Sequence, residues 1–265
     1  MNKDINDIWQ KLASIQAKDD IDALRKVLDP NDVKGVKNSY LDHYFKYYLH
    51  KYLDPGADDV ILEVGCGIGR LSEYISPFAG SVYGIDLVDK FIDSCNANIH
   101  KNKNTFYLHM SDRDKLKDIM INKMYTVGVL MFFIDNADLV KALRGYRDVL
   151  PNLKSAVLVE QVKRRSQTAQ RDREIYCRYR TIEEYRELFE SAGFTVKNYH
   201  ILGERYNGCI YRVIHLLCNV LPRTLARYSD TFFHIDKYLL SYKTNRTKFI
   251  NNKRPTDVVF QLEAD

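Results

Sequence analysis

The sequence lacks the features that mark secreted, membrane-spanning or zinc-binding proteins. Its five cysteines are scattered, and no two of them have the C-x-x-C spacing of a structural zinc site. No apolar run approaches the roughly 20 residues that cross a bilayer, and the amino-terminal residues lack the apolar core of a signal peptide. These absences predict a cytoplasmic protein without a metal site or a membrane span. Peripheral association with a membrane and oligomerisation stay open.

The composition is that of a globular domain. Hydrophobic residues make up 45% of the 265 residues, and the formal net charge is +5. A chain of this size builds one α/β domain with a substantial core and some elaborations, but it has no room for a second catalytic domain. The basic residues concentrate toward the carboxyl-terminal half.

The most informative motif is an apolar run that ends in three alternate glycines: Val60-Ile61-Leu62-Glu63-Val64-Gly65-Cys66-Gly67-Ile68-Gly69-Arg70. Such a run suits a strand buried on both faces, and the residues that follow return to helical spacing. The glycines permit positive φ and the close approach of a ligand to the backbone, beside a helix N-terminus with unpaired N–H groups. A dinucleotide-binding loop would have its third glycine where Arg70 stands. The motif therefore predicts a nucleoside-bearing cofactor other than NAD or FAD.

A second apolar run, Ser81 to Leu87, contains an acid at Asp86. This acid lies about 20 residues beyond the glycine loop, where nucleotide-binding βαβ units hold the ribose hydroxyls. Together, E-V-G-C-G-x-G-R and G-I-D-L resemble motifs I and II of the class I S-adenosylmethionine-dependent methyltransferases. The resemblance implies a seven-stranded Rossmann-like sheet and S-adenosylmethionine as the cofactor.

The resemblance also assigns roles to individual residues. It implies that Glu63 orders the loop near the methionine moiety, that the glycines lie under the cofactor, and that Asp86 binds both ribose hydroxyls. After a third strand, Thr105 to Leu108, Asp112 matches the acid that accepts from the adenine amino group. An N-cap of a helix from 113 to 120 is an equally good interpretation of Asp112. The full predicted cofactor-binding set is Glu63, Gly65, Cys66, Gly67, Gly69, Asp86, Leu87, Ser111, Asp112 and Met131.

The remaining elements complete an α/β fold with two helical additions. We expect a fourth strand over 126–131, a helix over 136–150, a fifth strand over 156–162, a helix over 181–191, a sixth strand from 194 to near 203, and a last, antiparallel strand over 257–262. The predicted segments are an amino-terminal helical cover (1–55), the cofactor-binding core (56–203), a helical insertion that covers the substrate pocket (204–256) and the last core strand (257–265).

The catalytic base is less clear from the sequence. Many members of the family carry a histidine just after strand four, but this chain has Phe132-Phe133-Ile134-Asp135-Asn136 there. The first candidates are therefore Glu160, at the active-site end of strand five, and Asp135. His215 and His234 in the insertion come next. Each also has a plainer interpretation: Glu160 pairs with a nearby arginine, and the histidines are surface or packed residues.

Basic residues follow strand five, at the edge of the sheet where ligands bind in open α/β folds. They are Lys163, Arg164, Arg165, Arg171, Arg173, Arg178 and Arg180. Arginines recognise phosphate and carboxylate groups in bidentate fashion, so we expect Arg164, Arg165 and Arg178 to bind the acceptor. Tyr40 and Tyr44, on a tyrosine stripe at helical spacing, either contact the acceptor or pack in the core.

The predicted function is methyl transfer to a hydroxyl or amine of an anionic small molecule or surface-glycan precursor. The chain lacks an Asn/Asp-Pro-Pro-Tyr/Phe element after strand four and a Pro-Cys nucleophile, which argues against nucleic acid as the acceptor. A protein or RNA methyltransferase, and a non-catalytic subunit that binds the cofactor, stay open as alternatives.

Overall fold

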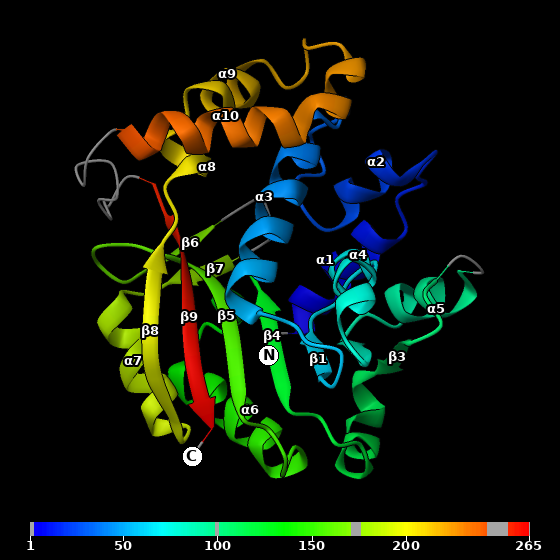
Figure 1. The fold of residues 1–265 in the computed structure, drawn as a ribbon, viewed down its shortest axis with the longest axis vertical. Helices are drawn as coiled ribbons and strands as arrows, with labels where there is room; N and C mark the ends of the chain where they lie inside the picture. Colours follow the sequence, from blue (N-terminus) through cyan, green and yellow to red (C-terminus); the bar gives the residue numbers. More distant parts are fainter. Residues whose placement is uncertain (1–2, 99–100, 171–175, 243–253, 265) are drawn as a thin grey trace.

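A seven-stranded sheet forms the centre of the molecule, with the strand order β3-β2-β1-β4-β5-β9-β8 (Figure 1). The computed structural model describes residues 3–98, 101–170, 176–242 and 254–264. The strands of the sheet are β1 (Val60–Val64), β2 (Ser81–Asp86), β3 (Thr105–His109), β4 (Lys123–Val127), β5 (Ser155–Val162), β8 (Phe194–Ile201) and β9 (Thr256–Ala264). The first five run parallel, and β9 is antiparallel to both of its neighbours. The expected fold class is confirmed.

Helices cover both faces of the sheet, which is why its central strands are largely apolar. On one face Leu143 and Phe189 pack against Leu158, and on the other Tyr44 packs against Val157. The α-helices outside the insertion are α1 (Lys3–Ala13), α2 (Asp20–Ala23), α3 (Val36–Leu53), α4 (Arg70–Ile75), α5 (Asp89–Ala97), α6 (Asn136–Val149) and α7 (Ile182–Ser191). Short 3₁₀ helices are η1 (Leu24–Lys26), η2 (Ser76–Phe78), η3 (Met110–Asp118) and η4 (Leu130–Phe132).

Two local predictions were wrong, and one hairpin was missed. The fourth strand ends at Val127, because Gly128 takes a φ of 68° and the chain then turns into η4. The helix expected over 113–120 is the 3₁₀ helix η3, and Asp112 lies in its first turn instead of capping it. The basic segment after β5 contains an unexpected hairpin of β6 (Gln167–Gln170) and β7 (Tyr176–Tyr179).

The chain between β8 and β9 forms a helical layer at the upper end of the molecule in Figure 1. Its helices are α8 (Glu204–Asn207), α9 (Cys209–Leu217), η5 (Arg223–Tyr228) and α10 (Ser229–Tyr242). Three α3 tyrosines at four-residue spacing each donate a hydrogen bond to a carboxylate in this layer or at the start of β9. These bonds are Tyr40 to Asp236 (2.9 Å), Tyr44 to Asp257 (3.0 Å) and Tyr48 to Glu204 (2.6 Å). None of the described helices is long and apolar enough to cross a membrane.

Candidate active site

The glycine loop and the acid after β2 form one unit. Gly65, Gly67 and Gly69 have φ values of 77°, 54° and 75°, in the left-handed region that favours glycine. A Cβ on Gly67 would lie only 2.7 Å from Val27 Cγ1, so the loop also needs the space that glycine leaves. Asp86 Oδ2 accepts from Gly67 N at 2.8 Å, and Asp86 Oδ1 accepts from Val88 N at 2.9 Å. The structure thus joins the two motifs that the sequence singled out.

Two other predicted residues of the loop are buried beneath it. Glu63 is 3% exposed and accepts hydrogen bonds from the hydroxyls of Ser72 and Tyr125, the latter at 2.9 Å. Burial raises the pKa of Glu63 to about 7, while these hydroxyls act in the opposite direction. Cys66 packs with Cys95 in a small buried cluster. Both side chains are therefore part of the buried structure that supports the loop.

The remaining predicted cofactor residues lie around the same edge of the sheet. Leu87 follows β2 and is half-buried, and Ser111 and Asp112 follow the neighbouring strand β3. Ser111 is exposed, and Asp112 forms an exposed ion pair with Lys115 at 3.1 Å. Met131, in η4 after β4, is 1% exposed and lines the large cavity described next. Their roles in cofactor binding stay predictions.

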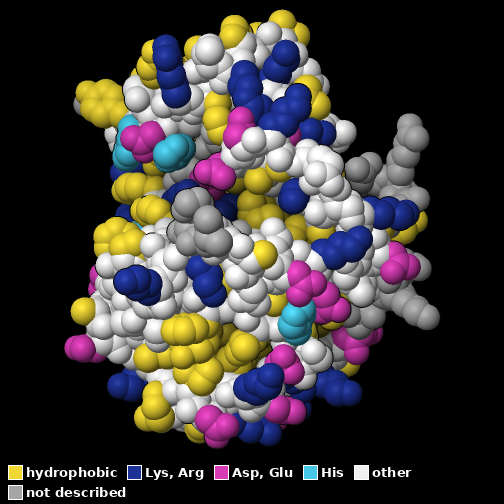
Figure 2. Space-filling view, turned by 90° about the vertical axis from the view of Figure 1, so that its right-hand side faces the viewer, with side chains coloured by type: hydrophobic (Ala, Val, Ile, Leu, Met, Phe, Trp, Pro, Cys, Tyr) yellow, Lys and Arg dark blue, Asp and Glu magenta, His cyan; other side chains and the backbone are white. Residues whose placement is uncertain are grey.

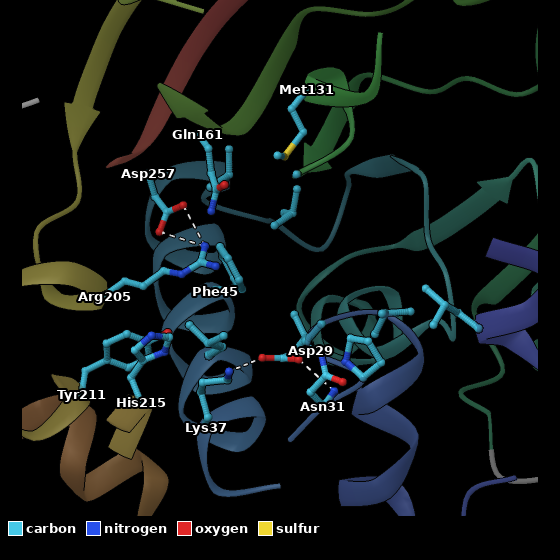
Figure 3. Close-up of a pocket in the computed structure, with 18 of the residues that line it drawn as sticks. Asp29, Asn31, Lys37, Phe45, Met131, Gln161, Arg205, Tyr211, His215 and Asp257 are labelled. Carbon is cyan, nitrogen blue, oxygen red and sulfur yellow. Dashed lines mark hydrogen bonds and ion pairs between the residues drawn. The ribbon is translucent and has the colours of Figure 1, made fainter. Parts of the chain in front are cut away.

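A cavity of about 1030 Å³ opens beside this edge (Figure 3). Its walls come from α1, the segment 27–31, α3, the β4–η4 turn, β5, α9 and the start of β9. The apolar wall includes Trp9, Leu41, Phe45, Met131 and Phe132. The charged side chains that line it are the cations Lys37, Arg70, Arg205, Arg212 and Arg254 and the carboxylates Asp29 and Asp257. Cations thus outnumber carboxylates, which favours an anionic ligand.

Several of these cations are held in place by carboxylates. Arg205 Nη1 lies 3.0 Å from Asp257 Oδ1, and Lys37 bonds to Asp29 (Figure 3). The guanidinium carbons of Arg70 and Arg205 each lie 5.9 Å from the centre of the Phe45 ring, so this ring packs against both. Because these ion pairs fix the side chains, the cavity presents guanidinium groups in defined positions.

Glu160, the first candidate base, does not line the cavity. It is 1% exposed, and its oxygens accept from the backbone N–H groups of Val129 (2.9 Å), Leu130 (2.8 Å) and Met131 (3.2 Å). Side chains alternate along a strand, so its neighbours in β5, Val159 and Gln161, line the cavity instead. Burial raises the pKa of Glu160 to about 7, against the effect of the N–H groups. The geometry makes Glu160 a positioning residue for η4, contrary to the expectation that it acts on the acceptor.

The three other candidate bases lie in different places. Asp135 is exposed and caps α6 by accepting from Ala137 N at 2.7 Å. His234 is half-exposed and lies 3.4 Å from Asp230, outside the cavity. His215 lines the cavity and stacks on Tyr211 with a ring separation of 5.9 Å. Burial, followed by the charges of nearby cations, lowers the pKa of His215.

The predicted acceptor-binding residues also lie outside the cavity. Tyr40 and Tyr44 are fully buried, and their hydroxyls bond to carboxylates as described above, so the core-packing alternative is correct. Arg164 and Arg165 are exposed after β5, and Arg178 binds Glu184 at 2.7 Å. Arg171 and Arg173 fall outside the described residues.

Arg180, the last residue of that basic run, has a structural role. It is fully buried and donates to the carbonyl oxygens of Leu130 (3.3 Å) and Phe133 (2.6 Å). Glu160 and Arg180 thus hold η4 through its N–H and C=O groups respectively.

The sequence missed several residues of the cavity. Gln161 follows the candidate base Glu160 directly in β5, but the sequence does not tell which of the two faces the cavity. Lys37 and Asp29 gave no signal, since they come from the amino-terminal cover and meet the cavity only in three dimensions. Arg205 and Arg212 belong to the basic residues of the carboxyl-terminal half, which the sequence did not assign to a site individually.

Comparisons with known proteins agree with this geometry. Residues 61–152 match the family model described as "Methyltransferase domain". A 23S rRNA (uracil(1939)-C(5))-methyltransferase RlmD from Tolumonas auensis is 31% identical over 100 residues, which are 37% of this chain and 22% of that protein. A probable cobalt-precorrin-6B C(15)-methyltransferase from Archaeoglobus fulgidus is 29% identical over 65 residues, which are 24% of this chain and 39% of that protein. The chain spans less than a quarter of the length of the RNA methyltransferases that it matches.

Solved structures share the fold over more of the chain. Geranyl diphosphate C-methyltransferase from Streptomyces coelicolor A3(2) superposes with a TM-score of 0.61 and 13% identity, over 100% of this chain and 99% of that one. Magnesium protoporphyrin IX methyltransferase from Synechocystis PCC 6803, with bound SAH, gives a TM-score of 0.51 and 10% identity, over 100% and 96%. The fold is that of the class I S-adenosylmethionine-dependent methyltransferases, and residues 61–152 match a methyltransferase domain.

The site fits the cofactor of this class, S-adenosylmethionine. The loop beside Asp86 leaves backbone N–H groups at the start of α4, and a Cβ on Gly128 would meet no atom within 4 Å. Gly128 also lines the cavity. The backbone after β4 therefore borders open space at the point where the cavity approaches the loop.

Proposed function

We propose that this protein transfers the methyl group of S-adenosylmethionine to a hydroxyl or amine of an anionic small molecule, such as a phosphate- or carboxylate-bearing carbohydrate precursor. The observation that carries the proposal is the single cavity that extends from Gly128 and Met131 to the cations Lys37, Arg205 and Arg212. An anionic acceptor bound by these cations would lie in the same space as the reactive end of the cofactor.

The residues of the chain divide the task. S-adenosylmethionine supplies a methyl group already activated on a sulfonium, so the protein mainly has to hold the acceptor in line with it. The glycine loop and Asp86 would bind the cofactor, and Arg205 and Arg212 would bind the anionic group of the acceptor. His215 would accept the proton from the acceptor, because its lowered pKa keeps the imidazole neutral near pH 7.

The first experiment measures the cofactor and the acceptor separately. S-adenosylhomocysteine should raise the melting temperature of the protein, and release of S-adenosylhomocysteine from S-adenosylmethionine should require a phosphorylated or acidic sugar. The matched neutral sugars should support much slower turnover. Equal turnover with neutral and anionic sugars would contradict the proposed role of the cations.

A pair of arginine variants tests where the acceptor binds. Arg212 lines the cavity, whereas Arg164 is exposed outside it. Arg212→Ala should raise the acceptor KM by roughly tenfold or more, as expected for the loss of a hydrogen bond to a charged group. Arg164→Ala should leave the acceptor KM unchanged. A raised acceptor KM in Arg164→Ala, with no change in Arg212→Ala, would indicate that the acceptor binds at the segment after β5.

RNA is the second candidate acceptor, because the curated relatives include RNA methyltransferases that are 31–35% identical to this chain over 52–100 residues. Methyl transfer to ribosomal RNA fragments, with no turnover on acidic sugars, would favour that function. Methyl transfer to a protein substrate is tested in the same assay with cell-extract proteins. Binding of S-adenosylhomocysteine without turnover on any of these acceptors would favour the non-catalytic alternative.

A further inference from the structure

The helix α9 is apolar on its outer face as well as its inner face. Inward, Tyr211 and Ile214 are buried in the core that the insertion shares with α3. Outward, Val213 and Leu216 are 52% and 79% exposed. We call the exposed residues Val213, Leu216, Leu217 and Val220 the α9 patch. Single exposed apolar side chains are ordinary, but four within eight residues indicate a surface that contacts something other than water.

A second helix of the same layer has a similar character. The side chains of Ile235, Tyr238 and Leu239 on α10 are 41%, 61% and 41% exposed. Their spacing of three and four residues puts them on one side of α10, opposite the buried Phe233 and Asp236. The apolar exposure is therefore a property of the helical layer and not of one turn.

The sequence of the insertion is strongly basic. Residues 204–256 contain ten Lys and Arg but only three acids, Glu204, Asp230 and Asp236. Glu204 and Asp236 are buried and accept the tyrosine hydroxyls of α3, so Asp230 is the one exposed acid among the described residues of the insertion. Figure 2 shows dark-blue and yellow side chains interspersed over the upper end of the molecule. Among the described residues of the insertion, the exposed charged side chains are thus the cations Arg212, Arg227 and Arg254 and the single acid Asp230, beside the exposed apolar side chains.

This combination selects among possible partners. A second copy of the chain, joined through the same face, would place arginine-rich surfaces opposite one another, which is unfavourable. A nucleic acid would bind the cations but would leave the valines and leucines of the α9 patch in water. A bilayer that contains anionic lipids satisfies both, because its acyl region accepts the apolar side chains and its headgroups attract Lys and Arg.

We infer that the outer face of the insertion, centred on the α9 patch, docks on the surface of a membrane rich in anionic lipids. The protein then lies on the bilayer as a peripheral protein and does not span it. Arg212, His215 and Leu216 of α9 also line the cavity, so docking brings the cavity wall to the headgroup region. If the proposed function holds, the acceptor is drawn from that surface.

The test is flotation of the full-length protein with lipid vesicles. Vesicles of equal parts phosphatidylcholine and phosphatidylglycerol should retain the protein, vesicles of phosphatidylcholine alone should retain far less, and high salt should weaken the retention. Val213→Ser/Val220→Ser, which leaves the cavity lining intact, should reduce retention by roughly tenfold. Phe106→Ser/Met120→Ser removes two exposed apolar side chains from the core domain and is the matched control, with retention unchanged.

The outcome does not depend on methyl transfer. The S-adenosylhomocysteine melting shift should be the same in all variants, which shows that each is folded and separates failure of docking from failure of the proposed function. Equal retention by both kinds of vesicle, or by the α9 variant and the parent, would overturn the inference. It would also be overturned if the parent sediments as a dimer that Val213→Ser/Val220→Ser dissociates, or if a single-stranded RNA binds through the same residues while vesicles do not.

Discussion

Asp86 links the cofactor loop to the sheet, so its removal affects both. Its two oxygens fix Gly67 N and Val88 N, which places the loop relative to the end of β2. A carboxylate oxygen has two acceptor sites, so each can hold a backbone N–H and still accept from a ribose hydroxyl. The same side chain can therefore position the loop and bind the cofactor.

Asp86→Ala should weaken S-adenosylhomocysteine binding by roughly tenfold to a hundredfold, because hydrogen bonds to a charged group are lost. Gly67→Val should abolish binding, since its side chain would strain a φ of 54° and collide with Val27. Calorimetric titration measures both. Asp89→Ala is the control, because Asp89 lies three residues further on and is exposed. Unchanged affinity in Asp86→Ala would remove this acid from the cofactor site.

The pH dependence of the reaction tests His215. The pKa of this histidine lies below its ordinary value of 6.5, so the neutral, proton-accepting form prevails at pH 7 and above. The rate kcat/KM should thus be constant above neutrality and fall as the pH drops through a pKa below 6.5. His215→Gln should lower kcat by roughly 10²–10⁴ and remove this acid limb. His234 lies outside the cavity, so His234→Gln should leave kcat and the acid limb unchanged. An acid limb that survives in His215→Gln would show that another group is the base.

The sequence located the residues of one local motif better than residues whose surroundings depend on the whole fold. The glycines and Asp86 lie within one βαβ unit, whose local geometry follows from the motif itself. Glu160 was misassigned because its position at the carboxyl end of β5 was correct but its side chain points to η4 and not to the cavity. Both faces of β5 are buried, so its sequence pattern does not tell which face a given residue occupies.

At the scale of elements, η4 is held in place by polar contacts from two buried side chains. Glu160 accepts hydrogen bonds from the N–H groups of Val129 and Leu130. Arg180 donates to the carbonyl oxygens of Leu130 and Phe133. Met131, within η4, lines the cavity. The position of this wall of the site therefore depends on two residues that do not touch the cavity.

Glu160→Gln should lower the free energy of unfolding by about 1–3 kcal/mol, because an amide cannot accept from all three N–H groups and leaves a buried donor unpaired. Urea denaturation measures this change. Glu184→Gln is the matched control, since Glu184 is half-buried and accepts from Asn136 and Arg178, which lie outside η4. Glu184→Gln should lower the free energy of unfolding by less than Glu160→Gln does. Equal losses in the two variants would mean that Glu160 has no special hold on η4.

The elements missed from the sequence are those whose form depends on tertiary contacts. The hairpin β6–β7 is short and polar on β6, so no alternating apolar pattern marks it. The fourth strand was placed too late because Val129, Leu130 and Met131 continue its apolar pattern beyond Gly128. There, the glycine conformation and the carboxylate of Glu160 favour a 3₁₀ turn over an extended strand.

At the scale of the whole molecule, α3 joins the sheet to the insertion. Its Tyr44 lies in the core beside the sheet and contacts Phe233 of α10, and its tyrosine hydroxyls donate to carboxylates of the insertion and β9. The sequence predicted a cover and an insertion as separate segments. It gave no sign that the tyrosine stripe pairs with Glu204, Asp236 and Asp257, because those acids lie 156–213 residues away along the chain.

This pairing predicts that the insertion is a fixed wall of the site and not a lid that opens freely. Opening would expose the apolar side of α9 and α10 and break the two buried hydrogen bonds that Tyr40 and Tyr48 donate to Asp236 and Glu204. Tyr48→Phe should lower the free energy of unfolding by about 1.5–3 kcal/mol, because Glu204 then loses its hydroxyl partner in a buried position. It should also speed amide hydrogen exchange in α10. Tyr52→Phe, one turn further along α3, is the control, since Tyr52 stacks on Tyr48 at the edge of this core and is only half-buried. If α10 exchanges as fast as an exposed loop in the parent protein, the tyrosine contacts do not hold the insertion closed, and the cavity wall moves during the reaction.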